Sequence, residues 1–216
     1  VLSVASEVVM IDGVCANREY RHYRIKTVQG ANDFASMHEV ITRRLLHGQT
    51  ELAERQAQGL DPKGGKFSDL PDLILIDGGA GQLAAAKDAM HACGMEIPMF
   101  GLAKRIEEIV LPYSDTRIVL DRHSSALHLI QRLRDEAHRF AITHHRALRS
   151  RASVSSRLDG VAGVGPERRK AILKHFKTVE ALHAASPEEI AQVPGLPESV
   201  ARNVYAMLHE GEGGEE

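Results

Sequence analysis

The sequence contains no tryptophan, and aromatic residues make up only 4% of it. Its two cysteines, Cys15 and Cys93, have no CxxC spacing, which argues against a disulfide framework and against a zinc knuckle. No apolar run approaches the roughly 20 residues of a membrane-spanning helix, and the first residues lack the charged start and cleavage site of a secretory signal. We therefore expect a cytoplasmic protein that does not span a membrane.

The composition is that of an ordinary globular protein. Of 216 residues, 43% are hydrophobic and 26% charged, which is enough for one large or two modest domains. The net charge of −2 argues neither for nor against nucleic acid, because only the distribution of charge reveals a basic face. That distribution is uneven: residues 131–151 hold six arginines and two acidic residues, whereas residues 211–216 are rich in glutamate and predict a disordered acidic tail.

The first part of the chain alternates strand and helix signals. Two extended segments that turn at Asp12-Gly13 predict an antiparallel hairpin, and Asn32 or Asp33 can cap a helix over residues 34–48. A polar loop is expected over residues 48–70. The remaining residues predict a buried strand (72–77), a helix (83–94), a strand (97–102), a hairpin (107–120) and a long helix (124–150). This order predicts an α/β layer fold over residues 1–150.

The amino-acid composition changes after Ser150. Residues 151–157 are small and polar and predict a linker, and residues 158–210 read as helices separated by glycine and proline. Within them, VAGVG (161–165) and VPGLP (193–197) form a two-copy repeat about 32 positions apart. Such hairpins let the backbone approach a phosphate and offer it amide donors at a helix N-terminus. The candidate DNA-binding residues are Gly163, Gly165 and Gly195, with Lys170 and Lys174 adding charge. A small helical protein-binding module is the alternative.

Asp77 is the first candidate for chemistry, because it ends the predicted buried strand where α/β folds bind ligands. Carboxylates there suit hard cations such as Mg²⁺, although Asp77 could instead cap the following helix. The run from Gly79 to Ala84 also satisfies G-x-G-x-x-G/A. A dinucleotide site needs an acidic residue at the end of the next strand, where this chain has Lys104 and Arg105. We therefore expect no small-molecule cofactor.

His138 is the second candidate. It lies on a polar flank of the predicted long helix, where an imidazole could ligate a metal or move a proton near neutral pH. Arg139 and Arg146 on the same helix could hold phosphate. A solvated charged face is the alternative, and it is the commoner explanation of such runs.

Four segments together resemble the C-terminal half of the UvrC family, the incision subunit of the bacterial UvrABC excision nuclease. They are PDLILIDGGAGQL, GLAKRIEEI, IQRLRDEAHRFAITHHR and LDGVAGVGPERRKAILKHF. The resemblance implies an RNase H-like mixed sheet with flanking helices, followed by a small all-α domain of tandem helix-hairpin-helix motifs. It also implies nucleotide excision repair, in which damaged double-stranded DNA (a bubble or junction) is cut on the 5′ side of the lesion after UvrB has opened the duplex.

The resemblance further implies a divalent metal, Mg²⁺ or Mn²⁺, held by two aspartates and a histidine. Asp77 in LIDGG matches one aspartate, and His138 in DEAHRF matches the histidine. Asp33 in NDF matches a further acidic position of the family. Lys104 in GLAK belongs to another family block and could face the scissile phosphate or have a structural role.

The chain departs from the family pattern in two respects. The family's other aspartate lies in an FDIS-type strand that would immediately precede Val1, so we expect the first strand and one catalytic aspartate to be missing. The segments for the 3′ cut and for docking on UvrB are also outside this sequence. The alternative to a nuclease is therefore a catalytically incomplete fragment, which only binds DNA and recognises its structure, such as a bubble or a junction. In the second hairpin Pro197 replaces a glycine and has no amide proton, so hairpin one is expected to bind more strongly.

Overall fold

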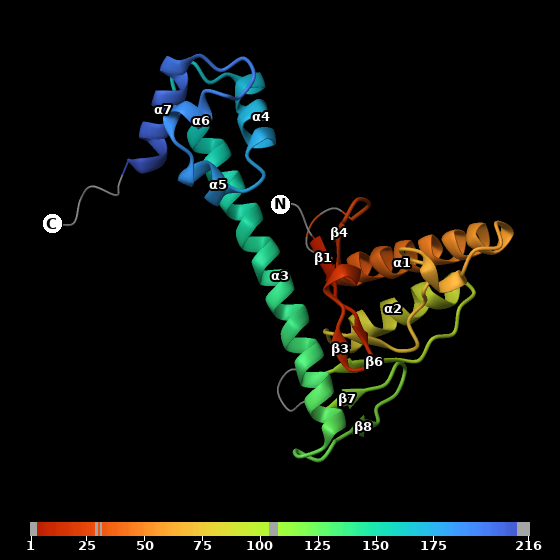
Figure 1. Ribbon diagram of the computed structural model, residues 1–216. Helices are drawn as coiled ribbons and strands as arrows, with labels where there is room; N and C mark the ends of the chain where they lie inside the picture. The colour runs from red at the N-terminus through yellow and green to blue at the C-terminus, as the bar shows by residue number, and fades with distance from the viewer. Residues whose placement is uncertain (1–3, 29, 31, 104–107, 211–216) are drawn as a thin grey trace. The chain divides into compact units, whose positions relative to one another are not determined.

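The computed structural model describes residues 4–28, 30, 32–103 and 108–210 (Figure 1). It divides into two compact units, Val1–Ala141 and Ile142–Glu216, which we treat separately and call the first and second unit. Within the described ranges, no helix combines the length and the apolar character that crossing a bilayer requires. The predicted acidic tail, residues 211–216, lies outside the described residues.

The first unit opens with two antiparallel strand pairs. Strand β1 (Val4–Glu7) pairs with β4 (Arg21–Arg24), and β2 (Met10–Ile11) pairs with β3 (Val14–Cys15). A short 3₁₀ helix, η1 (Asn17–Glu19), lies between β3 and β4. Both Asp12 and Gly13 have positive φ, at 50° and 75°, which is the backbone of a two-residue type I′ hairpin turn. The predicted hairpin with its turn at Asp12-Gly13 is confirmed.

A four-stranded mixed sheet follows, in the order β5-β6-β7-β8. Strands β5 (Ile74–Ile76) and β6 (Met99–Leu102) are parallel, as strands joined through a crossover helix usually are. Strands β7 (Ile109–Val110) and β8 (Arg117–Ile118) are added antiparallel. The predicted mixed sheet is therefore confirmed, and its parallel half is the half that carries Asp77.

Two helices, α1 (Asp33–Ala57) and α2 (Ala80–Ala92), pack against each other in this unit (Figure 1). The Asn32 side chain caps α1 by accepting a hydrogen bond from the backbone N–H of Ala35, as the sequence predicts. The core under these helices combines aliphatic side chains from both helices with side chains from the sheet: Ile41, Leu45, Ile76, Leu83, Ala86, Ala89, Met90, Met99 and Val110.

Helix α1 is longer than the sequence predicts, since residues 49–57 are helical and not part of a loop. Two polar side chains of this extension are bound to distant backbone. Gln49 Nε2 donates to the carbonyl of Cys93 at 2.9 Å, and the Glu51 carboxylate accepts hydrogen bonds from three consecutive N–H groups at residues 66–68. The remainder of the predicted loop contains only a short 3₁₀ helix, η2 (Pro62–Gly64).

Helix α3 (Ser125–Leu158) begins in the first unit and continues into the second. In the first unit its Phe140 ring stacks on His22 of β4, with ring centroids 4.0 Å apart. The neighbouring Tyr23 lies under Arg43 of α1, 5.8 Å from the ring centroid. Successive side chains of a strand point to opposite faces, so α1 and α3 cover opposite faces of the β1–β4 pair.

The structure places residues 151–157, for which the sequence predicts a linker, within α3. The reason lies in two side chains at helical spacing, Val154 and Leu158, which are 4% and 0% exposed. Both belong to the hydrophobic core of the second unit. The C-terminal end of α3, residues 151–158, is therefore stabilised by packing against this core, which the small and polar composition of the segment does not predict.

The second unit is all helical beyond α3, as the sequence predicts. Its helices are α4 (Pro166–His175), α5 (Val179–Ala184), α6 (Pro187–Ile190) and α7 (Glu198–His209). Thr178 and Ser186 cap α5 and α6 through their hydroxyl oxygens. The core gathers apolar side chains from every helix of the unit: Val154, Leu158, Ile172, Leu182, Ile190, Val193, Val204 and Leu208 are among its members.

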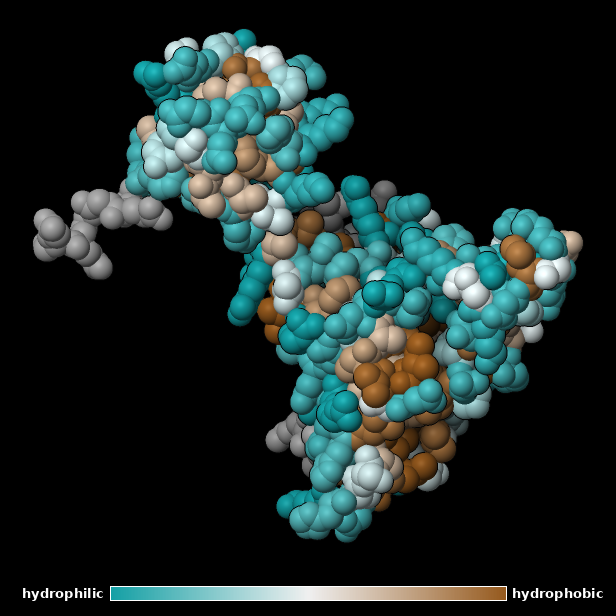
Figure 2. All heavy atoms as spheres, in the orientation of Figure 1, coloured by the Kyte–Doolittle hydropathy of each residue, from teal (hydrophilic) through white to brown (hydrophobic). Residues whose placement is uncertain are grey.

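The two units differ in how much hydrophobic surface they expose. Figure 2 shows hydrophobic residues on the face of the first unit that is in view. Among the described residues, the exposed large hydrophobic side chains belong almost entirely to that unit: Ile11, Val14, Phe34, Leu46, Leu60, Leu73, Tyr113, Ile118, Val119 and Leu129. The second unit buries its apolar side chains in a single core, which leaves a largely polar surface.

Candidate functional site

Asp77 lies immediately after β5, and its side chain is partly buried. The cap of α2 is Gly79, whose backbone N–H donates to Oε1 of Gln82 at 3.0 Å. Asp77 therefore does not cap the helix, and the alternative role considered for it is wrong. Its carboxylate is placed at the carboxyl end of a parallel strand, where α/β folds form their ligand crevices.

Asp33 is brought to the same end of the first unit. It is the first residue of α1, and the next residue, Phe34, lies against α2: a Cβ added to Gly81 would lie 2.5 Å from Cε1 of Phe34. The N-termini of α1 and α2 are therefore side by side, with Asp77 four residues before Gly81. We call this end of the unit, with Asp33 and Asp77, the Asp77 edge. Because helix N-termini carry partial positive charge, the edge also suits an anion such as phosphate.

Two glycines near Asp77, Gly81 and Gly101, have packing roles, whereas a Cβ on Gly79 would have no atom within 4 Å. Gly81 leaves room for the ring of Phe34, and a Cβ on Gly101 of β6 would lie 3.4 Å from Leu83 and 3.5 Å from the carbonyl oxygen of Gly78. Gly81 thus allows α2 to approach α1, and Gly101 allows β6 to approach Leu83 of α2 and the backbone at Gly78.

A buried carboxylate fixes the segment that leads into Asp33. Glu39 of α1 is 8% exposed and accepts hydrogen bonds from the N–H of Lys26, from the N–H and hydroxyl of Thr27, and from Arg43. Burial alone raises the pKa of this carboxyl, but the hydrogen bonds from Thr27, Lys26 and Arg43 together lower its pKa to about 2. Glu39 is thus ionised near neutral pH and ties the end of β4 to α1.

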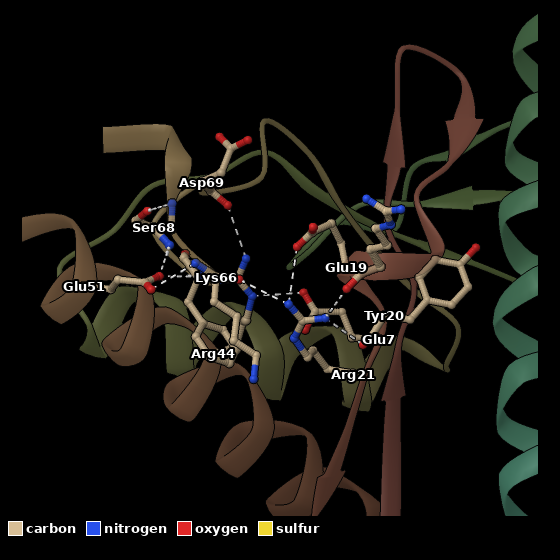
Figure 3. A network of polar contacts seen from close by, with 12 residues as sticks. Glu7, Glu19, Tyr20, Arg21, Arg44, Glu51, Lys66, Ser68 and Asp69 are labelled. Carbon is tan, nitrogen blue, oxygen red and sulfur yellow. Dashed lines mark hydrogen bonds and ion pairs between the residues drawn. The ribbon is translucent and has the colours of Figure 1, made fainter. Parts of the chain in front are cut away.

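A second polar network holds the loop before β5 (Figure 3). Arg44 of α1 donates to the carboxylate of Glu7 at 2.9 Å and to the carbonyl of Phe67 at 2.9 Å. Arg21 and Arg44 each lie 5.5 Å from the centroid of the Phe67 ring. Backbone hydrogen bonds from Phe67, Lys66 and Ser68 lower the pKa of Glu51. The network joins β1, α1 and the loop from which β5 departs.

His138 is exposed on α3, in the first unit. Its neighbour Arg139 donates two hydrogen bonds to Glu136, at 2.6 and 2.7 Å, and that interaction lowers the pKa of Glu136. A phosphate bound by Arg139 would therefore have to compete with the carboxylate of Glu136 on the same helix. Arg146 is exposed on the part of α3 in the second unit, and Lys104 lies outside the described residues.

The carboxylates of Asp33 and Asp77 are oxygen ligands of the kind that Mg²⁺ and Mn²⁺ prefer. Across the ranges that the structure describes, however, no three or more side chains of His, Cys, Asp or Glu form a group that could hold a metal ion. Asp33, Asp77 and His138 thus do not form such a group in this structure. The described residues therefore form no complete metal site.

The two predicted hairpins of the second unit have the same backbone bonding. The N–H of Val164 donates to the carbonyl of Val161 at 3.0 Å, and the N–H of Leu196 donates to the carbonyl of Val193 at 3.1 Å. Gly163 and Gly195 occupy equivalent positions with φ of 87° and 78°, which favour glycine. Helix α4 begins after Gly165, and α7 begins after Pro197, so the two hairpins differ in the residue that precedes the helix.

Arg168 is a residue of this region that the sequence patterns did not single out. Its Nη1 donates to the carbonyl of Gly163 at 2.7 Å, and its Nε donates to the carbonyl of Gly195 at 3.0 Å. One guanidinium thus joins the two hairpins. No local pattern marks this role, because the partner Gly195 lies in the other copy of the repeat.

Comparison with protein families matches residues 2–142 to the UvrC RNase H endonuclease domain. The chain belongs to this UvrC family. Residues 155–210 match a SAM-like helix-hairpin-helix tandem, which agrees with the two hairpins described above. The resemblance found in the sequence is confirmed, and so is the predicted order of an RNase H-like domain followed by tandem helix-hairpin-helix motifs.

Individual UvrC relatives match nearly the whole chain. A UvrABC system protein C of Symbiobacterium thermophilum is 47% identical over 218 residues, covering 95% of this chain and 34% of the relative. Those of Lachnospira eligens and Thermobifida fusca are 45% and 44% identical and cover 96% and 99% of this chain. The chain spans about a third of the length of these relatives, at 33% and 34%.

Proposed function

We propose that this chain is the part of a nucleotide excision repair endonuclease that hydrolyses a phosphodiester bond on the 5′ side of a DNA lesion. The observation that carries the proposal is the Asp77 edge in a domain of the UvrC family. There a partly buried carboxylate lies at the carboxyl end of β5, beside the N-termini of α1 and α2. That arrangement favours a phosphate and a cation over a neutral ligand.

Each predicted site residue has a proposed role in the reaction. Asp77 and His138, with Asp33 as a further carboxylate, would contribute to holding Mg²⁺ or Mn²⁺, which lowers the pKa of a bound water and offsets charge on the phosphate. The helix N-termini offer backbone donors to the phosphate, and the His138 imidazole is proposed to ligate the metal or to exchange a proton in the reaction. Lys104 is proposed to face the scissile phosphate.

The second unit is proposed to bind the DNA backbone of a bubble or junction. The hairpin residues Gly163, Gly165 and Gly195 would present amides to phosphates, and Lys170, Lys174 and Arg146 would add positive charge. Arg139, on the part of α3 in the first unit, is proposed to add a further cation for the DNA. We propose a nuclease domain over 1–150 and a DNA-binding domain over 158–210, whereas the two compact units divide between Ala141 and Ile142. In a complete protein we propose UvrB as the partner and the cytoplasm as the compartment.

The test is nicking of an end-labelled bubble duplex in Mg²⁺ or Mn²⁺, with DNA binding measured in parallel. Asp77→Asn and His138→Ala are each expected to reduce nicking at least 100-fold and to leave binding nearly unchanged. Asp72→Asn and His145→Ala are matched controls, since both side chains are exposed on neighbouring stretches of chain. Equal nicking by Asp77→Asn and the unsubstituted chain would contradict the proposed role of the Asp77 edge.

A second candidate function is a binding module without nuclease activity, which the incomplete metal-ligand set of the described residues favours. It predicts DNA binding that falls steeply with salt and does not respond to Asp77→Asn, with no nicking by any variant in either metal. A chain that neither nicks nor binds the bubble duplex would contradict both candidates.

A further inference from the structure

In the first unit, helix α3 carries His138 far from its most buried contact. Of the described α3 residues in this unit, Leu127 is the buried one, with 5% of its surface exposed. His138 lies three helical turns later, which is about 16 Å along the axis at roughly 1.5 Å per residue. Over that length, a tilt of about 10° at Leu127 moves the imidazole by roughly 3 Å. The contact at Leu127 therefore does not fix where His138 lies.

A ring stack holds the turn of α3 that carries His138. The Phe140 ring stacks on His22 of β4, with 4.0 Å between the ring centroids and 13° between the planes. It also meets the Tyr20 ring edge to face, with centroids 5.1 Å apart. The His22 ring is itself held, because its Nδ1 and the hydroxyl of Ser6 on β1 share a hydrogen bond of 3.0 Å. Phe140 is thus in contact with two rings at β4, one of which is anchored to β1.

Glu136 lies one turn before Phe140, and its side chain is only 17% exposed. Figure 3 shows the Tyr20 side chain turned toward α3. Burial raises the pKa of the Tyr20 hydroxyl, and the neighbouring Cys15 and Glu136 raise it further. Residues four apart share one face of a helix, so Glu136 and Phe140 both face Tyr20. His138 is two residues from each of them and lies on the other, exposed side of α3, so the contact that holds this turn leaves the imidazole free.

We propose that Phe140 is a positioning residue for the nuclease reaction: its contact with His22 and Tyr20 fixes the rotation and tilt of α3, and so where the His138 imidazole lies. The proposal rests on the proposed function, in which His138 acts in hydrolysis. A group that ligates a metal or moves a proton must be held to within about 0.5 Å. A misplacement of about 1 Å lowers a rate by up to roughly 100-fold. A stacked ring suits this task, because aromatic pairs prefer defined relative geometries that an aliphatic side chain does not impose.

The experiment compares Phe140→Leu with Phe140→Tyr in steady-state nicking of the bubble duplex, at a temperature where circular dichroism shows every variant folded. Phe140→Leu keeps an apolar side chain but removes the stack, so we expect kcat to fall roughly 10- to 100-fold and KM to change less than about twofold. Phe140→Tyr keeps the ring and should restore kcat to within about threefold of the unsubstituted chain. Leu129→Ala, which removes an exposed apolar side chain from an earlier turn of the same helix, is the matched control and should leave kcat unchanged.

A distance measurement tests the same contact without relying on cleavage. Spin labels are attached at His38→Cys on α1 and Asp135→Cys on α3, since both positions are exposed in the first unit. The native thiols are removed by Cys15→Ser and Cys93→Ser. We expect one narrow distance distribution in this labelled chain, a clearly broader one when Phe140→Leu is added, and the narrow one again with Phe140→Tyr.

Four outcomes would overturn the positioning role. They are an unchanged kcat in Phe140→Leu, equal losses of kcat in Phe140→Leu and Phe140→Tyr, a rise in KM at unchanged kcat, and a lower kcat without a broader distance distribution. If the unsubstituted chain does not nick DNA, the proposed function is contradicted, and the distance distribution alone decides whether Phe140 positions α3: a broader distribution in Phe140→Leu supports that role, and an unchanged one overturns it.

Discussion

Two segments of the first unit and the two hairpins of the second unit are held by different contacts. In the first unit, carboxylates of α1 accept hydrogen bonds from backbone N–H groups: Glu39 holds residues 26–27, and Glu51 holds residues 66–68. In the second unit, glycines with positive φ shape the hairpins, and the guanidinium of Arg168 donates to their carbonyls. The first arrangement depends on ionised acids, whereas the second depends on backbone geometry and on one planar guanidinium. Acid and glycine substitutions should therefore damage different units.

The largest effect is expected from Gly163→Ala. A left-handed residue with a Cβ costs about 1–2 kcal/mol, and the added Cβ would lie 2.7 Å from Cγ2 of Val200, a stiff β-branched side chain of the core. Overpacking adds roughly 1–3 kcal/mol. We expect the second unit to lose about 2–5 kcal/mol of unfolding free energy, measured by urea-dependent hydrogen exchange of peptides from residues 158–210.

Gly195→Ala is the matched comparison, because Gly195 has the same kind of backbone, with φ of 78°, but no atom within 4 Å of an added Cβ. Only the conformational cost of about 1–2 kcal/mol should remain. Equal losses for the two variants would show that contact with Val200 does not distinguish the hairpins.

The next effect is the acid sensitivity of the first unit through Glu39. Its pKa is lowered from an ordinary value of 4.5 to about 2, so its stabilising contribution is complete above pH 4.5 and is lost as the pH falls toward 2. Each pKa unit corresponds to about 1.4 kcal/mol; allowing for partial screening, we expect a contribution of roughly 2 kcal/mol at pH 7. Hydrogen exchange of residues 20–57 at pH 7 and pH 3 measures it.

Glu39→Gln should destabilise the first unit at pH 7 and make little difference near pH 2, while the exposed Glu54→Gln should do neither. The second unit should show no matching loss in the same samples, because Glu39 and Ser68 are the buried polar or charged residues among those described, and both belong to the first unit. A variant whose deficit persists unchanged at pH 2 would assign the effect to packing and not to charge.

The sequence predicted those elements whose signals are local. The Asp12-Gly13 turn, the buried strand before Asp77 and the two glycine hairpins each follow from a few adjacent residues. The end of α1 did not, because Gln49 and Glu51 are held by backbone more than 14 positions away along the chain. Residues 151–157 look like a linker in composition, and only the distant core around Val154 makes them helical.

In the candidate site, too, local sequence patterns predict single residues but not the contacts between distant ones. Asp77 was found because a carboxylate at the end of a buried strand is a local pattern, and its match to the family supplied the expected role. Its proximity to the start of α1 depends on Phe34 packing against Gly81, a contact between residues 47 positions apart that no local pattern contains. Arg168 was missed for a similar reason, since its partner Gly195 lies in the other copy of the repeat.

A smaller effect is expected from Arg168→Lys. A lysine keeps the charge but lacks the planar fork that reaches the carbonyls of Gly163 and Gly195 together. We expect a stability loss of about 1 kcal/mol and a DNA affinity that falls several-fold with an unchanged salt slope, because the hairpins lose their fixed spacing while the charge remains. Arg202→Lys, on the exposed face of α7, is the control. Full DNA affinity in Arg168→Lys would assign the residue a purely electrostatic role.

The smallest effect should come from Pro197→Gly, which makes the second hairpin resemble the first. Pro197 precedes α7 with φ of −64° and ψ of 150°, a backbone that glycine also adopts, so the helix should start at the same residue. Glycine adds the amide donor that proline lacks but costs up to about 1 kcal/mol in unfolded-state entropy. We expect a two- to fivefold gain in DNA affinity with slightly lower stability, measured by titration and urea unfolding. Pro194→Gly, a change of the same kind inside the same hairpin but not at the helix start, should lower stability without the gain in affinity. If both variants bind DNA equally, the missing amide at residue 197 is not what makes the second hairpin weaker than the first.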